Sequence, residues 1–196
     1  KEGNFDTWGI QGGVGPISSR LLLDGPLVKG KTSLILGARG SVSDFYLGYF
    51  PNPALKKSKA DFYDVNFKLT HKLNENQRIS LSGYISHDGF KFASDTLYSW
   101  QTQSLSFKHN ALWGNLSHNF TAFVSDYQYG IEGMKKGLEF DWNPSIKQKT
   151  VREDLSLDLK GKGRVDFGAE FNLYQNDAGT FRPTSPSSDV NEFPMQ

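Results

Sequence analysis

The 196-residue sequence predicts an all-β fold, an antiparallel up-and-down arrangement of about nine long strands that forms a segment of a transmembrane β-barrel. Three observations lead to this prediction. Apolar and polar residues alternate through most of the chain, the alternating segments are long, and short polar turns alternate with longer connections. We expect residues 1–175 to hold the strands and loops of this barrel segment, and residues 176–196 to be a loop-like tail.

The clearest unit is the hairpin at residues 61–88, DFYDVNFKLTHKL-NENQ-RISLSGYISHD. In its first arm, apolar residues and one histidine occupy the odd positions of residues 63–73, and the even positions are polar. A tight polar turn at residues 74–77 leads into a second alternating arm. Each arm has about eleven to thirteen residues, whereas a typical globular strand has about five or six and a tilted membrane-crossing strand needs roughly nine to eleven.

Three strands are expected before this hairpin. The first is weak and rich in glycine, and Gly15-Pro16 turns the chain into the second. A short basic turn at residues 29–31 precedes the third, which ends in an aromatic cluster of Phe45, Tyr46, Tyr49 and Phe50. A polar loop containing proline follows at residues 51–60. The three strands are expected at residues 5–13, 17–27 and 32–46.

Four strands are expected after the hairpin, in two pairs. The first pair follows a loop at residues 89–99, and the second pair follows the longest break, at residues 129–150. Leu138, Phe140 and Trp142 alternate within that break and indicate a strand extension there. The four strands are expected at residues 100–110, 115–128, 151–160 and 165–174.

The connections alternate in length, which places nearly all the short turns at one end of the strands. Short periplasmic turns and long extracellular loops are typical of outer-membrane barrels. Aromatic residues also gather near strand ends, as in the girdles at membrane interfaces: Trp8, Tyr46, Tyr63, Trp100, Trp113 and Tyr127. A soluble antiparallel barrel or sandwich also alternates, but the strand lengths, the charges along the polar faces and these aromatics favour the membrane barrel.

Composition excludes several classes of function. The net charge of +1 gives no indication of nucleic-acid binding, and the absence of cysteine excludes disulfides, thiolate metal sites and cysteine nucleophiles. No run of 18 apolar residues indicates a membrane-spanning helix. The opening KEGNFDTW is not a signal peptide, so we expect either a cytosolic protein or a mature or excised piece.

The segment GGVGPISSRLLLDGPLVKGKTSLILGARGSVSDFYL resembles the start of the barrel in TonB-dependent outer-membrane receptors of the Bacteroidetes type. Those receptors commonly show G-x-I-S-S-R-L-x-L-[ED]-G-P-[IL], a short basic turn, and S-F-I-x-x-[AG]-R. The matching stretches are residues 15–27, 29–31 and 33–39. Further on, FYDVNFKLTHKLNENQRISLSGYISHDGFKF and VDFGAEFNLYQNDAGTFRP are similar to the next hairpin and to a later strand with its extracellular segment.

The resemblance implies a piece of a larger receptor in the bacterial outer membrane, with a plug domain and a barrel of about 22 strands. The plug, its TonB-contacting box and the signal peptide would precede Lys1, and more than half of the barrel would follow Gln196. Such receptors import a nutrient of the siderophore, glycan or peptide class, captured on extracellular loops and released when TonB pulls the plug. The implied partners are outer-membrane lipid and lipopolysaccharide, the plug and remaining strands, TonB, and, in the glycan-importing branch of the family, a surface lipoprotein. No nucleic acid, enzyme activity or cofactor is implied.

Substrate contacts, if this chain makes any, are expected on the polar, lumen-facing parity. The candidates there are Arg39, Asp64, Asn66, Lys68, Ser82, Tyr84, Asp166, Glu170 and Asn172. Most such residues only hydrate the wall or tie it to a plug. No catalytic motif such as G-x-S-x-G, a P-loop or H-E-x-x-H occurs.

Other polar residues have simpler interpretations. The histidines fall on the lipid-facing parity near strand ends, without metal-ligand spacing: His71, His87, His109 and His118. The acidic pairs Glu153/Asp154 and Asp158/Asp166 are expected to pair in the lumen with Arg152, Lys160 and Arg164 rather than to act as acids and bases. The basic loops at residues 56–59 and 135–136 are expected to be solvated, with lipopolysaccharide phosphate as the alternative ligand.

Two other functions remain open. One is a self-contained outer-membrane barrel of about eight to ten strands for adhesion or envelope integrity. The other is a soluble β-barrel or sandwich that binds a small ligand or glycan. Because the two edges of an incomplete sheet expose unpaired backbone groups, we expect further strands or another chain to cover them.

Overall fold

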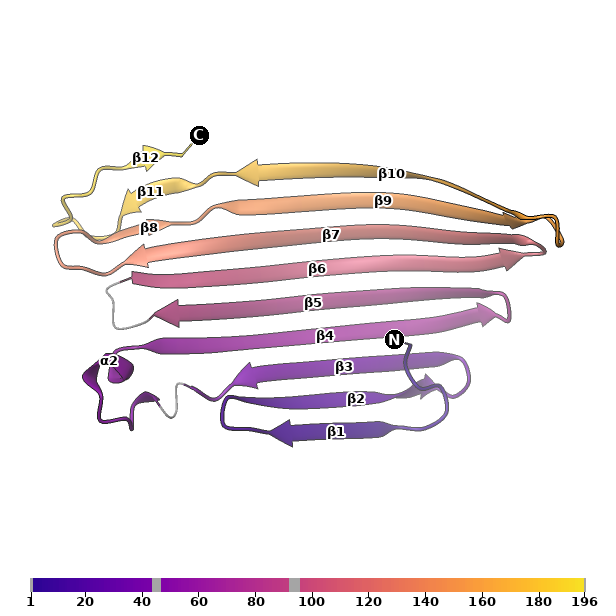
Figure 1. The fold of residues 1–196 in the computed structure, drawn as a ribbon, viewed down its shortest axis with the longest axis horizontal. Helices are drawn as coiled ribbons and strands as arrows, with labels where there is room; N and C mark the ends of the chain where they lie inside the picture. Colours follow the sequence, from indigo (N-terminus) through magenta and orange to yellow (C-terminus); the bar gives the residue numbers. More distant parts are fainter. Residues whose placement is uncertain (1, 44–46, 92–95, 196) are drawn as a thin grey trace.

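The computed structural model describes residues 2–43, 47–91 and 96–195, and the described chain is all-β. Its long strands form one antiparallel up-and-down sheet in which strands consecutive in the sequence lie side by side (Figure 1). This confirms the predicted class and connectivity. Within the described residues the sheet does not close into a barrel, because β1 pairs only with β2 and β10 pairs only with β9.

The long strands correspond one to one with the strands expected from alternation. In the described part of the chain, three short strands and one short helix accompany them. The long strands are β1 (Gly9–Val14), β2 (Ser18–Val28), β3 (Thr32–Ser41), β4 (Lys59–Asn74), β5 (Gln77–Lys91), β6 (Thr96–Trp113), β7 (Leu116–Gly133), β9 (Ser145–Asp158) and β10 (Arg164–Asp177). The short elements are α2 (Pro53–Lys56), β8 (Phe140–Trp142), β11 (Thr180–Pro183) and β12 (Phe193–Pro194).

Tight turns join β2 to β3, β4 to β5, β6 to β7 and β9 to β10 at one end of the sheet, which we call the short-turn end. Gly30 and Gly114 adopt φ values of 71° and 63° in two of these turns, a conformation that favours glycine. The opposite end, the long-connection end, carries α2, β8 and the C-terminal segment (Figure 1). The predicted short turns are therefore confirmed.

At the long-connection end, β5, β6, β7 and β9 are longer than alternation predicted. The expected break at residues 129–150 is wrong in extent, because β7 runs to Gly133, β8 lies within the break and β9 begins at Ser145. The loop expected at residues 89–99 is likewise mostly strand, and its remainder, residues 92–95, lies outside the described residues. Here Phe90 pairs with Tyr98, and Tyr98 with Ile131, so apolar residues occupy the face that is polar elsewhere and the alternation disappears.

Two further boundaries differ from expectation. β3 ends at Ser41 instead of reaching residue 46, and Phe45 and Tyr46 of the expected aromatic cluster lie outside the described residues. The segment expected as a loop-like tail begins with the end of β10 and also holds β11 and β12. β11 crosses back to pair with β8, so no strand among the described residues covers the outer edge of β10.

The strand register gives the sheet two different faces. One register row on the apolar face joins Leu23, Leu36, Phe67, Gly83, Leu105, Val124, Lys149 and Leu173 across β2 to β10. The neighbouring row on the polar face joins Leu22, Gly37, Asn66, Tyr84, Ser104, Ser125, Gln148 and Tyr174. The period-two pattern of the sequence therefore continues across the whole sheet.

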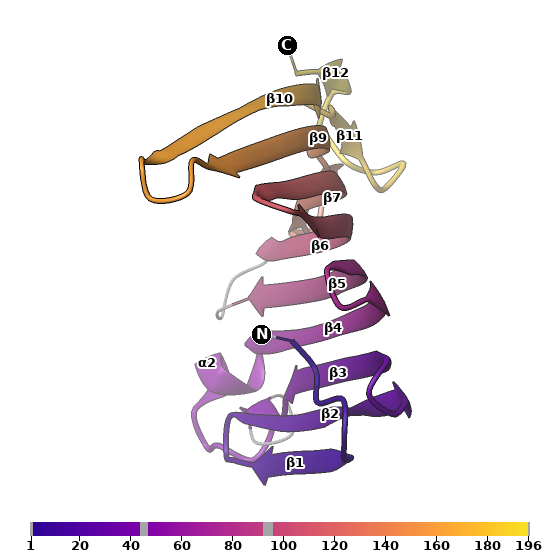
Figure 2. The same cartoon turned by 90° about the vertical axis from the view of Figure 1, so that its right-hand side faces the viewer.

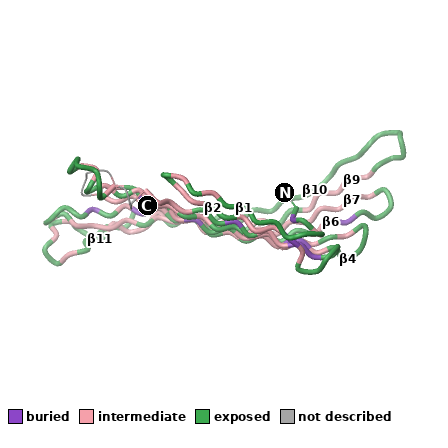
Figure 3. The backbone as a smooth tube through the Cα atoms, turned by 90° about the horizontal axis from the view of Figure 1, so that it is seen from below, coloured by how far each residue is buried: buried purple, intermediate pink, exposed green. Residues whose placement is uncertain are grey.

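No second layer packs on either face of the described sheet, which forms a single twisted layer (Figures 2 and 3). Among the described residues the one buried hydrophobic side chain is Ala111, at 5% exposure. The other buried side chains are small and polar, and Ser33 and Thr70 among them lie on the polar face near the N-terminal segment. A sheet with one apolar face normally buries that face against another layer. The described part of this chain supplies no such layer and therefore has no hydrophobic core of its own.

Candidate functional site on the polar face

The structure places every predicted lumen-facing residue on the polar face, in two groups. Arg39, Asp64, Asn66, Lys68, Ser82 and Tyr84 lie on β3, β4 and β5, whereas Asp166, Glu170 and Asn172 lie on β10. The strands β6, β7 and β9 separate the two groups. The candidates therefore line one surface without forming one pocket.

In the first group, Arg39 and Asp64 are opposite each other in the ladder between β3 and β4. The Arg39 Nε donates a hydrogen bond to Asp64 Oδ2 at 2.7 Å, and its guanidinium carbon lies 5.2 Å from the centre of the Phe62 ring. The side-chain amide of Asn66 lies over Gly37, where a Cβ would be only 2.9 Å from the amide oxygen. The absent side chain of Gly37 thus leaves space for Asn66.

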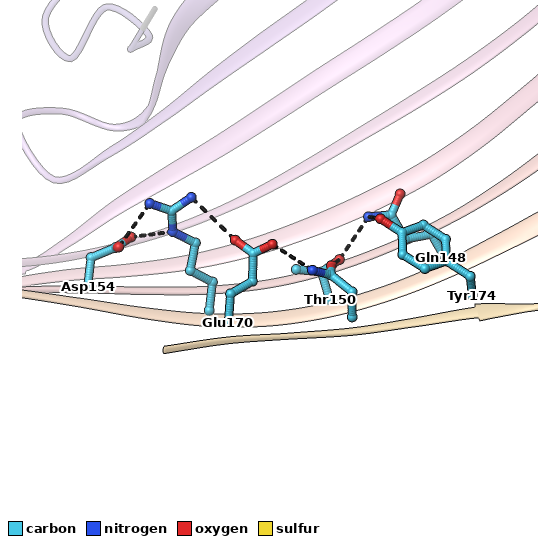
Figure 4. Close-up of polar contacts among 7 residues, drawn as sticks. Gln148, Thr150, Asp154, Glu170 and Tyr174 are labelled. Atoms are coloured by element: carbon cyan, nitrogen blue, oxygen red, sulfur yellow. Dashed lines mark hydrogen bonds and ion pairs between the residues drawn. The ribbon is translucent and has the colours of Figure 1, made fainter. Parts of the chain in front are cut away.

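In the second group, Arg152 on β9 connects two carboxylates (Figure 4). Its Nε and Nη2 donate to Asp154 at 2.7 and 2.9 Å, and its Nη1 lies 3.4 Å from Glu170 Oε2 across the ladder. All three side chains are about half exposed to solvent. The guanidinium therefore offsets two negative charges on a surface open to water.

The same network continues along β9 and β10 toward the long-connection end (Figure 4). Asn172 donates to Glu170 at 2.6 Å and accepts from the Thr150 hydroxyl at 2.6 Å. The Gln148 amide then donates to Thr150 at 3.0 Å and to the Tyr174 hydroxyl at 3.2 Å. The result is a row of donors and acceptors that can bind water or a polar ligand such as an amide or a sugar hydroxyl.

An aromatic pocket lies on the polar face at the long-connection end, and alternation alone did not indicate it. The rings of Trp100 and Tyr129 are 5.6 Å apart, those of Tyr129 and Trp142 are 6.0 Å apart, and Trp142 Nε1 donates to the Ala178 carbonyl at 2.7 Å. Trp100 and Tyr129 border a pocket of about 600 Å³ whose lining also includes Tyr127, Ile146, Asn176 and Asp177.

This pocket corrects part of the girdle prediction. Trp100 and Tyr127 lie on the polar face, because they share register rows with Asp88 and with Arg39 and Asp64 respectively. Tyr63 and Trp113 do lie on the apolar face, and Tyr46 is outside the described residues. In the sequence, aromatic residues stand two positions apart within residues 98–102 and again within residues 127–131, and this was the signal that could have revealed the pocket.

The histidines lie on the apolar face, as their parity predicted. His71 Nδ1 is 2.8 Å from the Thr32 hydroxyl, and His118 Nδ1 is 2.7 Å from Glu153 Oε1. Glu153 is therefore on the apolar face, and its expected pairing with a lumen cation is wrong because it has the opposite parity to Asp154.

The other acidic residues behave more nearly as expected. Arg152 pairs with Asp154 and Arg164 pairs with Asp166, each at 2.7 Å, which confirms these two pairs. Asp158 instead accepts a hydrogen bond from the backbone amide of Lys160 at 2.8 Å.

The apolar residues of the apolar face form a band that runs obliquely across the register rows. On β3 the band covers Leu34 to Ala38, and on β10 it covers Val165 to Leu173. The register row that contains Ala38 on β3 and Val65 on β4 continues to the charged residues Asp126 on β7 and Lys147 on β9. Near the short-turn end, the row of Leu157 on β9 and Val165 on β10 is apolar. The centre of the band thus moves by roughly four residues over about six strand steps, an angle of roughly 25° at ordinary strand spacings.

In the described part of the chain, no helix has the length and hydropathy needed to cross a membrane. Within the same residues, no group of three or more histidine, aspartate and glutamate side chains could hold a metal ion. No family model, curated protein or solved structure matches this chain.

Proposed function

We propose that this chain is part of the β-barrel wall of a TonB-dependent receptor in a bacterial outer membrane, which imports a nutrient of the siderophore, glycan or peptide class. The observation that carries the proposal is the pair of unlike faces on a single layer without a core. One face would contact lipid and the other a water-filled lumen. The chain would contribute wall and loops to transport and no chemistry of its own.

The exposed apolar face supports the lipid contact. Phe171, Phe167 and Leu173 are 68%, 53% and 52% exposed, and they belong to a band that crosses all the long strands from β2 to β10. Burial of one such side chain stabilises a protein by about 1.5–3 kcal/mol, so leaving the whole band in water would be very costly. Hydrocarbon on one side and water on the other satisfy both faces without a second protein layer.

The oblique band supports the same arrangement. Strands in outer-membrane barrels are tilted by roughly 35–45°, so a flat slab of hydrocarbon covers different register rows on successive strands. A soluble sandwich has no flat slab to match. The polar residues Asp126 and Lys147 would then lie beyond the hydrocarbon, although they share a register row with Val65.

The receptor assignment rests on the resemblance at residues 15–39, which coincide with β2, the basic turn and β3. In that family the short turns are periplasmic, so the long-connection end would be extracellular and the aromatic pocket would lie near the mouth of the lumen. The implied partners are outer-membrane lipid and lipopolysaccharide, a plug inside the lumen, TonB acting through the plug, and further strands that pair with β1 and β10.

A pair of single cysteines tests the proposal. This chain contains no cysteine, and any cysteine elsewhere in the intact protein is first replaced by serine. Ala122→Cys would place a spin label on the apolar face and Thr121→Cys would place one on the polar face of the same strand. In the membrane-embedded protein we expect label 122 to be relaxed by dissolved oxygen and label 121 by a water-soluble nickel chelate. Equal access of the nickel chelate to both labels would refute a lipid-facing wall.

The receptor assignment itself needs a separate measurement. We expect the intact protein to fractionate with the outer membrane, to be much larger than the 22.0 kDa of this chain, and to lose nutrient uptake when TonB is removed. An outer-membrane protein of about the size of this chain would instead favour the small stand-alone barrel. A protein that stays in solution without detergent would favour the soluble binding domain.

A further inference from the structure

We propose that Lys147 and Lys149 form the headgroup site for a phosphate-bearing lipid on the apolar face. The inference rests on the proposed membrane location, because only then does this face meet lipid. It adds a specific ligand site on the outside of the wall, separate from the polar face.

The register places both lysines at the margin of the apolar band. Lys149 lies between Val124 on β7 and Leu173 on β10, and the next apolar-face residue of β9 toward the short-turn end is Val151. Lys147 lies one step toward the long-connection end, between Asp126 and Gln175. One lysine therefore reaches from the edge of the hydrocarbon and the other lies just beyond it.

The protein itself compensates these charges only partly. The Lys147 ammonium is 3.9 Å from Asp126 Oδ2, a loose ion pair, and its side chain is 52% exposed. Among the described residues, no carboxylate forms an ion pair with Lys149. A lysine at a lipid margin extends its ammonium group toward the interface, where an anionic headgroup offsets the charge.

A groove of about 470 Å³ on the apolar face leads away from the two lysines across β7, β6 and β5 to β4. Its apolar lining includes Phe67, Ile85, Leu105 and Val124. Gly83 shapes its floor, because the Phe67 ring occupies the position where a side chain on Gly83 would be, with ring carbon Cε1 2.3 Å from an ideal Cβ.

The two lysines together with the apolar groove favour a lipid over a free anion. An acyl chain would lie along the apolar lining of the groove, and the phosphate would reach the ammonium groups at its end. Inorganic phosphate would leave the apolar lining empty. Because the long-connection end is extracellular in the proposed orientation, the lipid would come from the outer leaflet, whose phosphorylated glycolipid has this chemistry.

The test uses the whole protein, extracted from the outer membrane in detergent, stripped of lipid and offered lipid A, dephosphorylated lipid A or inorganic phosphate. Native mass spectrometry would count the molecules retained. We expect Lys147→Gln/Lys149→Gln to weaken lipid A binding by about thirtyfold, the factor for losing two surface cations. Lys108→Gln is the matched control, because Lys108 is an exposed lysine on the polar face of β6.

Three results would overturn the site: equal lipid A binding by the double variant, equal binding of dephosphorylated lipid A, or displacement of lipid A by millimolar inorganic phosphate. Membrane fractionation is read on the same samples. A protein found in the outer membrane whose double variant binds normally refutes the lysine site alone. A protein recovered in the soluble fraction refutes the membrane location and the lysine site together.

Discussion

Gly168 on β10 lies opposite Asp154, close to the backbone of β9. A Cβ at this position would be 2.3 Å from the carbonyl oxygen of Glu153, and a backbone atom cannot move aside as a side chain can. We therefore predict that Gly168→Ala shifts the pairing of the two strands and lowers the free energy of unfolding by about 1–3 kcal/mol, the usual range for overpacking. Urea unfolding followed by tryptophan fluorescence would measure it.

Gly40 provides the matched control for that substitution. It is also a strand glycine, but the nearest atom to its ideal Cβ is 3.8 Å away. Gly40→Ala should leave stability unchanged or raise it slightly, because it only reduces the freedom of the unfolded chain. If both alanine variants were equally stable, the close approach at Gly168 would not limit the sheet.

Arg152 donates hydrogen bonds to both Asp154 and Glu170, and its positive charge offsets the repulsion between these two carboxylates. We predict that Arg152→Gln lowers the thermal unfolding midpoint, and that the loss is larger at low ionic strength because salt screens the remaining repulsion. Adding Glu170→Gln should recover part of the loss. Arg164→Gln is the control, because Arg164 pairs with Asp166 in a more exposed position, and a loss as large as that of Arg152→Gln would contradict the bridging role.

At the level of single residues, the sequence predicts faces better than partners. The parity of Arg39, Asp64 and Glu170 places each of them on the polar face without any coordinates. Contacts within one strand, such as Arg152 with Asp154, also follow from a spacing of two. The contact of Arg39 with Asp64 does not, because it depends on the register across the connection between β3 and β4, and that register has no local signal in the sequence.

Each long strand presents alternate residues to two different solvents in the proposed location, and β5 offers a compact test. Leu81 lies near the middle of the band, between Leu69 and Phe107, and Ser82 is its neighbour on the polar face. We predict that Leu81→Arg destabilises the folded protein in bilayers by about 2–4 kcal/mol, whereas Ser82→Arg is tolerated. Unfolding by guanidinium in lipid vesicles measures both variants, and equal costs would argue against a hydrocarbon face.

β10 is an edge strand in this chain, and its fourteen residues are all exposed. Every second backbone amide of an antiparallel edge strand points away from its partner. In hydrocarbon an unpaired group costs several kcal/mol, so we predict that a further strand covers this edge in the intact protein. Hydrogen exchange should then find both sets of β10 amides protected, and rapid exchange of the alternate set would show that the edge is free.

The strands themselves are the part of the fold that the sequence predicts most reliably, and their ends at the long-connection end are the least predictable. Alternation identifies a strand only where its two faces meet different environments. Near Tyr98 and Ile131 both faces carry apolar or aromatic residues, so the pattern ends before the hydrogen-bonded ladder does. β11 is four residues long and pairs with β8 instead of its neighbour β10, so local periodicity cannot reveal it.

For the whole molecule, the oblique apolar band predicts how the strands are tilted relative to the membrane. The register rows run across the strands, and the band crosses those rows because its residues shift toward the short-turn end from β3 to β10. If the band marks the hydrocarbon slab, its angle to the rows equals the tilt of the strands from the membrane normal. This relation uses only the positions of the apolar residues and the ladder, and it is independent of any resemblance.

Polarised infrared spectroscopy of the protein in oriented bilayers can measure that tilt. We predict a mean strand tilt between roughly 25°, the angle of the band, and 45°, the upper range for outer-membrane barrels. The single layer is twisted, which lowers the angle read from a flat projection, so the measured value should exceed the lower figure. Strands parallel to the membrane normal would contradict the inference that the apolar band is the part of the sheet that lies in hydrocarbon. Strands without a preferred orientation would mean that the apolar face is covered by protein, since only a lipid layer aligns every strand to one axis.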